Sequence, residues 1–94
     1  MYTVLRRYSD HTVIDAVVAQ HADVEKLLRG VTGFVAYYAV RTGTGGVTIT
    51  VCQDKAGTTE STRRAAEYVR QNISAAAGSP PEVTEGETVI NFSA

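Results

Sequence analysis

The chain has 94 residues and a formal net charge of −1, so we expect one domain over residues 1–94 and no strongly basic surface for nucleic acid. Its single cysteine, Cys52, excludes an internal disulfide, and no apolar run approaches the roughly 20 residues that cross a bilayer. The first residues read as a strand and not as a secretory signal, so we expect a cytoplasmic protein without membrane contact.

The first half of the chain predicts a strand, a helix and a second strand. Residues 2–9 are rich in β-branched and aromatic types and predict the first strand. From Thr12 to Arg29, apolar residues recur at intervals of three and four, which predicts one amphipathic helix. Residues 34–41 include seven consecutive apolar residues, which indicates a strand covered on both faces. The chain's own helices can cover one face, and the other calls for a partner.

The second half predicts a hairpin, a helix and a last strand. Residues 42–46 form a glycine-rich connection in which glycine supplies a positive φ, and residues 47–53 alternate as a strand does. Asp54 is a suitable cap for a second helix. The inner stripe of that helix consists of small residues, which allow a close approach to the sheet or leave a cavity: Thr58, Thr62, Ala65, Val69, Ile73 and Ala76. Residues 82–92 form the last strand, with a bulge or bend at Gly86.

This order, βαββαβ, predicts an α+β fold of ferredoxin-like architecture. Two split βαβ units give a four-stranded antiparallel sheet with both helices on one side. The open face would carry apolar side chains of residues 34–41, and such a patch is rarely left in water. A homodimer that packs sheet against sheet is therefore expected.

Three segments carry a resemblance to a known family: residues 33–41 (GFVAYYAVR), 51–56 (VCQDKA) and 61–69 (STRRAAEYV). They resemble the antibiotic biosynthesis monooxygenase-like group of the dimeric α+β barrel superfamily. The resemblance implies a homodimer whose sheets close into a barrel, with a pocket between each sheet and its own helices. It also implies a monooxygenase-like protein that acts on or binds a small aromatic or polyketide-like compound without a cofactor.

The chain departs from the enzymatic branches of this superfamily in two ways. Family oxygenases place a tryptophan near the end of the third strand, where this chain has Cys52, and it contains no tryptophan. Haem-degrading members use an asparagine on strand one and a histidine on helix two. This chain has Arg6 and Arg7 on strand one and no histidine in residues 55–76, which argues against haem degradation. A non-catalytic ligand-binding or structural homodimer is therefore the alternative.

His21 is the candidate catalytic residue. It falls on the apolar stripe of the predicted helix and titrates near neutrality, so it could transfer a proton in the pocket. The alternative is a packed histidine bonded to a carbonyl or a tyrosine. Candidate ligand-binding residues are Tyr8, Tyr37, Tyr38, Arg41, Cys52 and Tyr68. Because successive strand residues face opposite sides, Tyr37 and Tyr38 do not share a pocket, and the sequence leaves open which faces inward.

Two of these candidates have clear structural alternatives. Arg41, like Arg6 and Arg7, could hold a carboxylate or phenolate, but an ion pair with Glu85 or Glu87 of the last strand, within the chain or across the dimer, is the simpler interpretation. Cys52 could be a nucleophile if its pKa were lowered, but a small buried apolar residue is the simpler interpretation.

The remaining classes of function find little support. The spacing of histidine and cysteine provides no metal site. An RNA recognition motif shares the βαββαβ order, but residues 47–53 offer no aromatic or basic side chain for stacking a base. An amino-acid-sensing regulatory domain of ferredoxin-like shape remains a further alternative.

Overall fold

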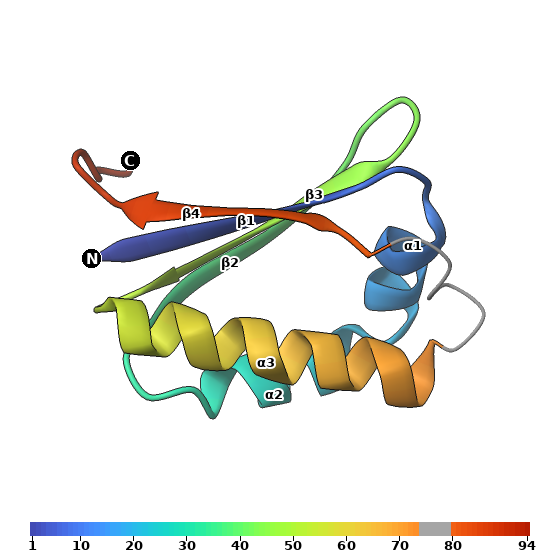
Figure 1. The fold of residues 1–94 in the computed structure, drawn as a ribbon, viewed down its shortest axis with the longest axis horizontal. Coiled ribbons are helices and arrows are strands. Elements are labelled where there is room, and N and C mark those ends of the chain that lie inside the picture. The colour runs from blue at the N-terminus through green and yellow to red at the C-terminus, as the bar shows by residue number, and fades with distance from the viewer. Residues whose placement is uncertain (74–79) are drawn as a thin grey trace.

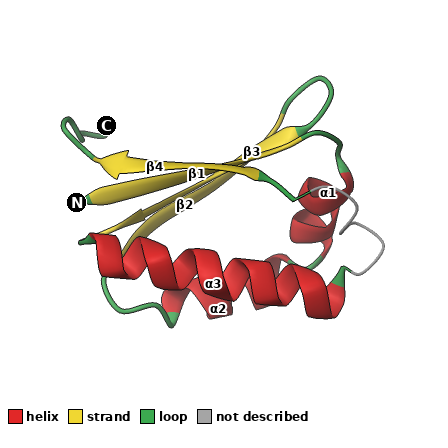
Figure 2. Cartoon of the chain, in the orientation of Figure 1, coloured by secondary structure: helices red, strands yellow, loops and turns green. Residues whose placement is uncertain are grey.

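The structure, a computed structural model, describes residues 1–73 and 80–94. Its elements in chain order are β1 (Tyr2–Tyr8), α1 (Thr12–Ala19), α2 (His21–Arg29), β2 (Phe34–Arg41), β3 (Gly46–Cys52), α3 (Lys55–Asn72) and β4 (Glu82–Glu87). The strands form one antiparallel sheet in the order β2-β3-β1-β4, seen in Figures 1 and 2. The predicted ferredoxin-like α+β fold is confirmed, with its first helix divided in two.

All three helices lie on one side of the sheet (Figure 1), so the sheet has an inner and an outer face. On the inner face Val4, Thr50 and Cys52 are completely buried. On the outer face Tyr38 is 57% exposed and Val40 is 45% exposed. The core between the two layers consists of Val4, Val13, Ile14, Val24, Leu28, Val31, Cys52 and Ile73. Within residues 1–73 and 80–94, no helix covers the outer face.

The predicted continuous helix from Thr12 to Arg29 is wrong, because Gln20 interrupts it. Gln20 leaves the helical conformation (φ −111°, ψ 32°) and serves as the last cap of α1 and the first cap of α2. Its side-chain oxygen accepts a hydrogen bond from the hydroxyl of Tyr68 on α3. This break takes His21 out of the apolar stripe that a continuous helix would have given it.

The connection between β2 and β3 closes as predicted, but for a different reason. The backbone N–H of Thr42 donates a hydrogen bond to the carbonyl oxygen of Gly45, and the N–H of Gly45 donates one to the hydroxyl oxygen of Thr42, both at 3.1 Å. No glycine of this connection has a positive φ; in the described part of the chain that conformation occurs at Gly33. A Cβ on Gly46 would lie 2.1 Å from Cγ1 of Ile14, so glycine is needed there to let α1 approach.

Small residues on the inner stripe of α3 allow either a close approach to the sheet or a cavity, and the helix shows both. At its start, the Asp54 carboxylate accepts a hydrogen bond from the N–H of Gly57 at 3.0 Å, which confirms the predicted cap. The following turns approach the sheet so closely that Thr58 and Ser61 are completely buried. Farther along, the helix borders hollows lined by Ala65 and other small or apolar residues. Ala76, predicted for the same stripe, lies outside the described residues.

Strand β4 ends at Glu87, earlier than predicted, because β1, its one partner in the sheet, begins at Tyr2. One more main-chain bond follows, from the N–H of Thr88 to the carbonyl of Met1 at 2.9 Å.

The predicted bulge or bend at Gly86 is also wrong. Gly86 pairs in register with Thr3, and the ladder continues on both sides of it. The irregularity in the sheet lies in β2, between Phe34 and Ala36.

Replacing Gly57 with alanine is expected to lower the free energy of unfolding by about 1–3 kcal/mol, the usual effect of overpacking. The new Cβ would lie 2.7 Å from Cβ of Cys52 and 3.2 Å from the carbonyl oxygen of Thr32. The free-energy cost of this clash is expected to exceed the gain in helix propensity from glycine to alanine, which is about 1 kcal/mol. Urea unfolding followed by circular dichroism measures the change.

The matched control is Gly43→Ala, since no atom lies within 4 Å of the position of its Cβ. Equal unfolding midpoints for the two variants would contradict the close packing of α3 on β3.

Candidate functional site

Three neighbouring hollows lie in the described part of the structure. The α2–β2 groove, of about 640 Å³, lies between α1, α2 and the edge strand β2. The core pocket, of about 40 Å³, lies between the sheet and the helices. The α3 pocket, of about 440 Å³, lies between α3, β1 and β4. The core pocket and the α3 pocket adjoin, because five residues line both: Arg6, Tyr8, Val13, Ala65 and Val69.

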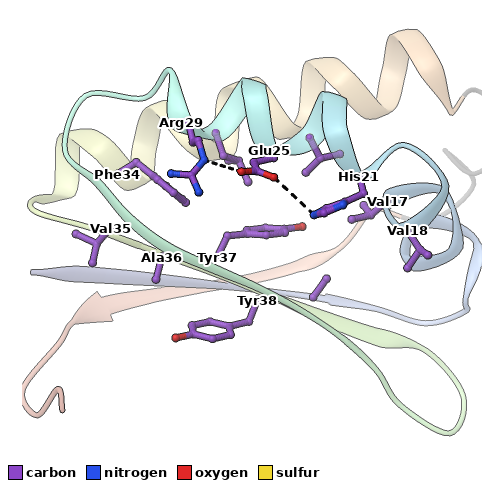
Figure 3. A pocket seen from close by; sticks show the side chains of 13 residues that line it. Val17, Val18, His21, Glu25, Arg29, Phe34, Val35, Ala36, Tyr37 and Tyr38 are labelled. Carbon is purple, nitrogen blue, oxygen red and sulfur yellow. Dashed lines mark hydrogen bonds and ion pairs between the residues drawn. The ribbon is translucent and has the colours of Figure 1, made fainter. Parts of the chain in front are cut away.

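His21 lies on the α2–β2 groove and not in the interior, as Figure 3 shows. Its side chain is 81% exposed and lies 3.8 Å from the carboxylate of Glu25, which also accepts a hydrogen bond from Arg29 at 2.7 Å. These exposed pairs one helical turn apart contribute little to stability. His21 is therefore not packed in the core, and it shares the lining of this open groove with Tyr37.

The structure decides which of the two consecutive tyrosines faces inward. Figure 3 shows Tyr37 on the helical side of β2 and Tyr38 on the opposite side. Both tyrosines line the groove, but of the two only Tyr37 also lines the core pocket, and Tyr38 is largely exposed on the outer face. The bulge between Phe34 and Ala36 precedes both residues, so the inward residue depends on a register that the sequence pattern does not give.

Three of the predicted tyrosines meet in the core pocket: Tyr8 from β1, Tyr37 from β2 and Tyr68 from α3. Burial raises the pKa of Tyr8. Burial, and then the neighbouring Tyr8, raise the pKa of Tyr37 to about 12. Both phenols therefore remain protonated at neutral pH and can donate a hydrogen bond to an oxygen of a ligand.

Arg41 and Cys52 lie apart from these hollows. Arg41 forms an ion pair with Asp15 on α1. The expected pairing of Arg41 with the last strand does not occur within the chain, because β2 and β4 are opposite edges of the sheet. Cys52 is completely buried, and burial, together with Asp54, raises the pKa of its thiol. A neutral thiol packed against α3 fits the structural role and not the nucleophilic one.

Arg6 is the site residue whose position the sequence analysis missed. It is 3% exposed on the inner face of β1, between the three hydroxyls of Thr50, Ser61 and Thr62. Strand alternation was the available signal, because it places Arg6 on the same face as Val4 and Tyr8. Arginine is rarely buried without a charged partner, so the general tendency of this residue predicts a solvent-exposed Arg6 in spite of the alternation.

The α3 pocket provides an apolar surface with few polar groups. Apart from Arg6, Tyr8, Thr62 and Arg70, its lining consists of aliphatic and proline residues: Val13, Ala65, Ala66, Val69, Pro80, Pro81 and Val83. Pockets of this size and composition are typical of small-molecule sites. Among residues 1–73 and 80–94, no group of three histidine, cysteine or acidic side chains could hold a metal ion. Within the same residues, no helix is long and apolar enough to cross a membrane.

No protein-family model and no curated protein sequence matches this chain. Solved structures do. A protein of unknown function from Nitrosomonas europaea, NE2512, has a TM-score of 0.76 at 19% identity, over 99% of this chain and 93% of its own. SnoaB, a cofactor-independent oxygenase from Streptomyces nogalater, has a TM-score of 0.66 at 18% identity, over 97% and 95%. The monooxygenase from the gene ActVA-Orf6 of Streptomyces coelicolor, solved with the ligand Nanaomycin D, has a TM-score of 0.61 at 18% identity, over 98% and 91%.

These matches span nearly the whole length of the chains compared, at identities of 18–19%. An antibiotic biosynthesis monooxygenase-like protein from Bordetella bronchiseptica also matches, with a TM-score of 0.70 at 14% identity, over 95% of this chain and 97% of its own, so the chain has the fold that the sequence resemblance predicted. A shared fold does not determine a reaction, because one fold supports many sites.

Replacing Tyr37 with phenylalanine is expected to remove the last step of tyrosine ionisation, near pH 12, from an absorbance titration at high pH. An unfolded tyrosine ionises near pH 10, so the folded state retains a proton that the unfolded state has released. The ionisation of Tyr37 therefore leaves the free energy of unfolding unchanged below pH 10 and lowers it as the pH rises from 10 toward 12. Tyr38→Phe, on the opposite face, should leave the step near pH 12 in place; its loss in that variant would contradict the assignment.

Proposed function

We propose that this protein binds a small aromatic or polyketide-like compound in the α3 pocket and acts on it as a cofactor-independent, monooxygenase-like protein. The α3 pocket, of about 440 Å³, is the observation that carries this proposal. It is large enough for a compound of two or three fused rings and is lined mainly by apolar side chains. Tyr8, at the boundary with the core pocket, supplies a hydroxyl that can orient an oxygen of such a compound.

The fold supports the same proposal. SnoaB is a cofactor-independent oxygenase, and the ActVA-Orf6 monooxygenase was solved with Nanaomycin D. Both share the layered arrangement that places a pocket between the sheet and its helices in this chain. The proposal therefore takes the class of compound from these two proteins and assigns none of their catalytic residues to this chain.

A non-catalytic ligand-binding protein is the second candidate, and the position of His21 favours it. His21 lines the exposed α2–β2 groove, so it does not stand in the α3 pocket where the compound would bind. Without it, the interior offers Tyr8 and Tyr37, both protonated at neutral pH, and Arg6. These groups can hold and orient a ligand, but none is a general base at neutral pH.

We also propose that two copies pair through the outer faces of their sheets. Tyr38 and Val40 of β2, which pair with Ile49 and Val47 of β3, are 57% and 45% exposed on that side of the molecule. Val47, Ile49 and Val51 of β3 continue the same apolar face beside them. A second copy offers an identical apolar face, and a two-fold pairing would bury both faces as an α+β barrel.

Replacing Ala65 with leucine tests the ligand site, because Ala65 lines both the core pocket and the α3 pocket. The wild-type protein should be stabilised against heat by one member of a panel of naphthols, naphthoates and hydroxyquinones. A ligand at about 100 times its Kd adds roughly 2.7 kcal/mol, equivalent to about 10 °C or more for a domain of this size. The larger side chain should abolish the shift.

Ala22→Leu, on the exposed surface of α2, is the matched control and should retain the shift. An equal shift in Ala65→Leu would place the ligand elsewhere and overturn the proposal. Oxygen uptake and product absorbance with the bound compound then separate the two candidates: turnover supports the monooxygenase-like protein, and binding without turnover supports the non-catalytic one.

Replacing Tyr38 with lysine tests the homodimer. A charge at this position would be buried without a partner in the paired faces, so the variant should be a folded monomer where the wild type is a dimer. Sedimentation equilibrium measures the mass, with Thr44→Lys in the exposed hairpin connection as the control. A wild-type protein that is monomeric at high micromolar concentration would contradict the pairing.

A further inference from the structure

Arg6 is a buried cation whose side-chain hydrogen-bond partners are all neutral hydroxyls. Its Nη1 donates to the hydroxyl of Thr50 at 3.2 Å. Its Nη2 donates to the hydroxyls of Ser61 at 3.2 Å and Thr62 at 2.8 Å. With 3% of the residue exposed, water does not replace the missing counter-charge.

No carboxylate in the described part of the chain lies within the 4.0 Å that defines an ion pair with Arg6. The remaining residues, 74–79, contain neither aspartate nor glutamate. The buried Nε of Arg6 also lacks a hydrogen-bond partner among residues 1–73 and 80–94. The guanidinium therefore has donor capacity and charge that the chain itself leaves unused.

Such an arrangement destabilises the folded protein. Removing a charged group from water costs several kcal/mol unless an opposite charge and hydrogen bonds compensate for it. Burial accordingly lowers the pKa of Arg6, although Tyr8, Tyr37, Cys52 and the carboxylate of Glu85 on β4, which forms no ion pair with Arg6, act in the opposite direction. An apolar residue at this position would fill the same space without this cost, so the buried charge needs an explanation other than stability.

The charges around the α3 pocket supply that explanation. Arg6 lies on the wall shared by the core pocket and the α3 pocket, and Arg70 lines the α3 pocket from the last turns of α3. Neither hollow has an aspartate or glutamate in its lining. Both cations therefore favour a negative charge in the α3 pocket, and its apolar walls would strengthen that attraction.

We infer that the ligand of the α3 pocket is an anionic aromatic compound whose ionised oxygen, a carboxylate or a phenolate, binds the guanidinium of Arg6. This inference rests on the proposed function and specifies the class of compound that the pocket takes. A charge-assisted hydrogen bond to guanidinium is stronger than one between neutral groups, and its planar fork matches a carboxylate. The apolar rings would lie against Ala65 and Val69 of α3.

The test compares two ligands of the same shape, 2-naphthoate and 2-naphthamide, by isothermal titration calorimetry at pH 7. The first carries the ionised oxygen and the second does not. Wild-type protein should bind 2-naphthoate at least tenfold more tightly, a difference of about 1.4 kcal/mol. Arg6→Gln should lose this preference while it binds 2-naphthamide as the wild type does.

Two further variants control the comparison. Arg6→Lys retains the charge without the fork and should keep part of the preference, which covers the case in which Arg6→Gln does not fold. Arg63→Gln removes an exposed cation of α3 that pairs with Glu60 and Glu67 and lines neither the core pocket nor the α3 pocket. It should keep the full preference.

The outcomes separate this inference from the proposed function. Equal binding of the two ligands by the wild type would overturn the anionic class and leave the ligand pocket intact. A preference for 2-naphthoate that survives in Arg6→Gln would overturn the role of Arg6. Binding of neither ligand would count against the pocket and the inference together.

Discussion

The close contact between the first turns of α3 and the end of β3 determines the shape of the interior. Gly57 has room for no side chain beside Cys52, and Asp54 fixes the start of the helix by accepting a hydrogen bond from the same glycine. The helix is thus held against the sheet at one end. Toward its other end, Ala65 and Val69 are too small to fill the space below them, and the core pocket and the α3 pocket lie there. One helix therefore closes the core at its beginning and leaves room for a ligand beyond it.

Arg6 lies between the packed end and the open end of this interior. Its hydroxyl partners Ser61 and Thr62 belong to the buried face of α3, so the helix that makes the pocket also positions the cation. Neutral hydroxyls orient a guanidinium without neutralising it, which leaves its charge available to a ligand. Binding sites often contain groups that stability alone would not select, and they are most effective when the fold holds them in place. The unpaired charge of Arg6 and the apolar walls of the α3 pocket would therefore bind the two parts of one ligand, its ionised oxygen and its rings.

The two faces of the sheet have different environments, and this difference connects the ligand site with the proposed pairing. Tyr37 points to the helices and contributes to the core pocket, whereas Tyr38 points away and adds to the outer apolar face. His21 belongs to neither surface, because the break at Gln20 places it on the exposed α2–β2 groove with Glu25. A proton-transfer role for His21 in the interior would need a rearrangement of α2. The interior therefore depends on tyrosine and arginine for its polar chemistry.

The sequence by itself determined the order of the elements, the antiparallel sheet and the two-sided apolar character of residues 34–41. These features follow from local periodicity and from cap and turn residues such as Asp54, which act over a few positions. Only the tertiary structure decided which neighbouring tyrosine faces inward, that Gln20 divides the first helix, and that Arg6 is buried without a counter-ion. Each of these depends on contacts between segments far apart in the chain: the bulge in β2 against β3, the Tyr68 hydroxyl on Gln20, and the hydroxyls of α3 around β1. Periodicity carries no information on such contacts, because they depend on how closely the layers approach and at which register.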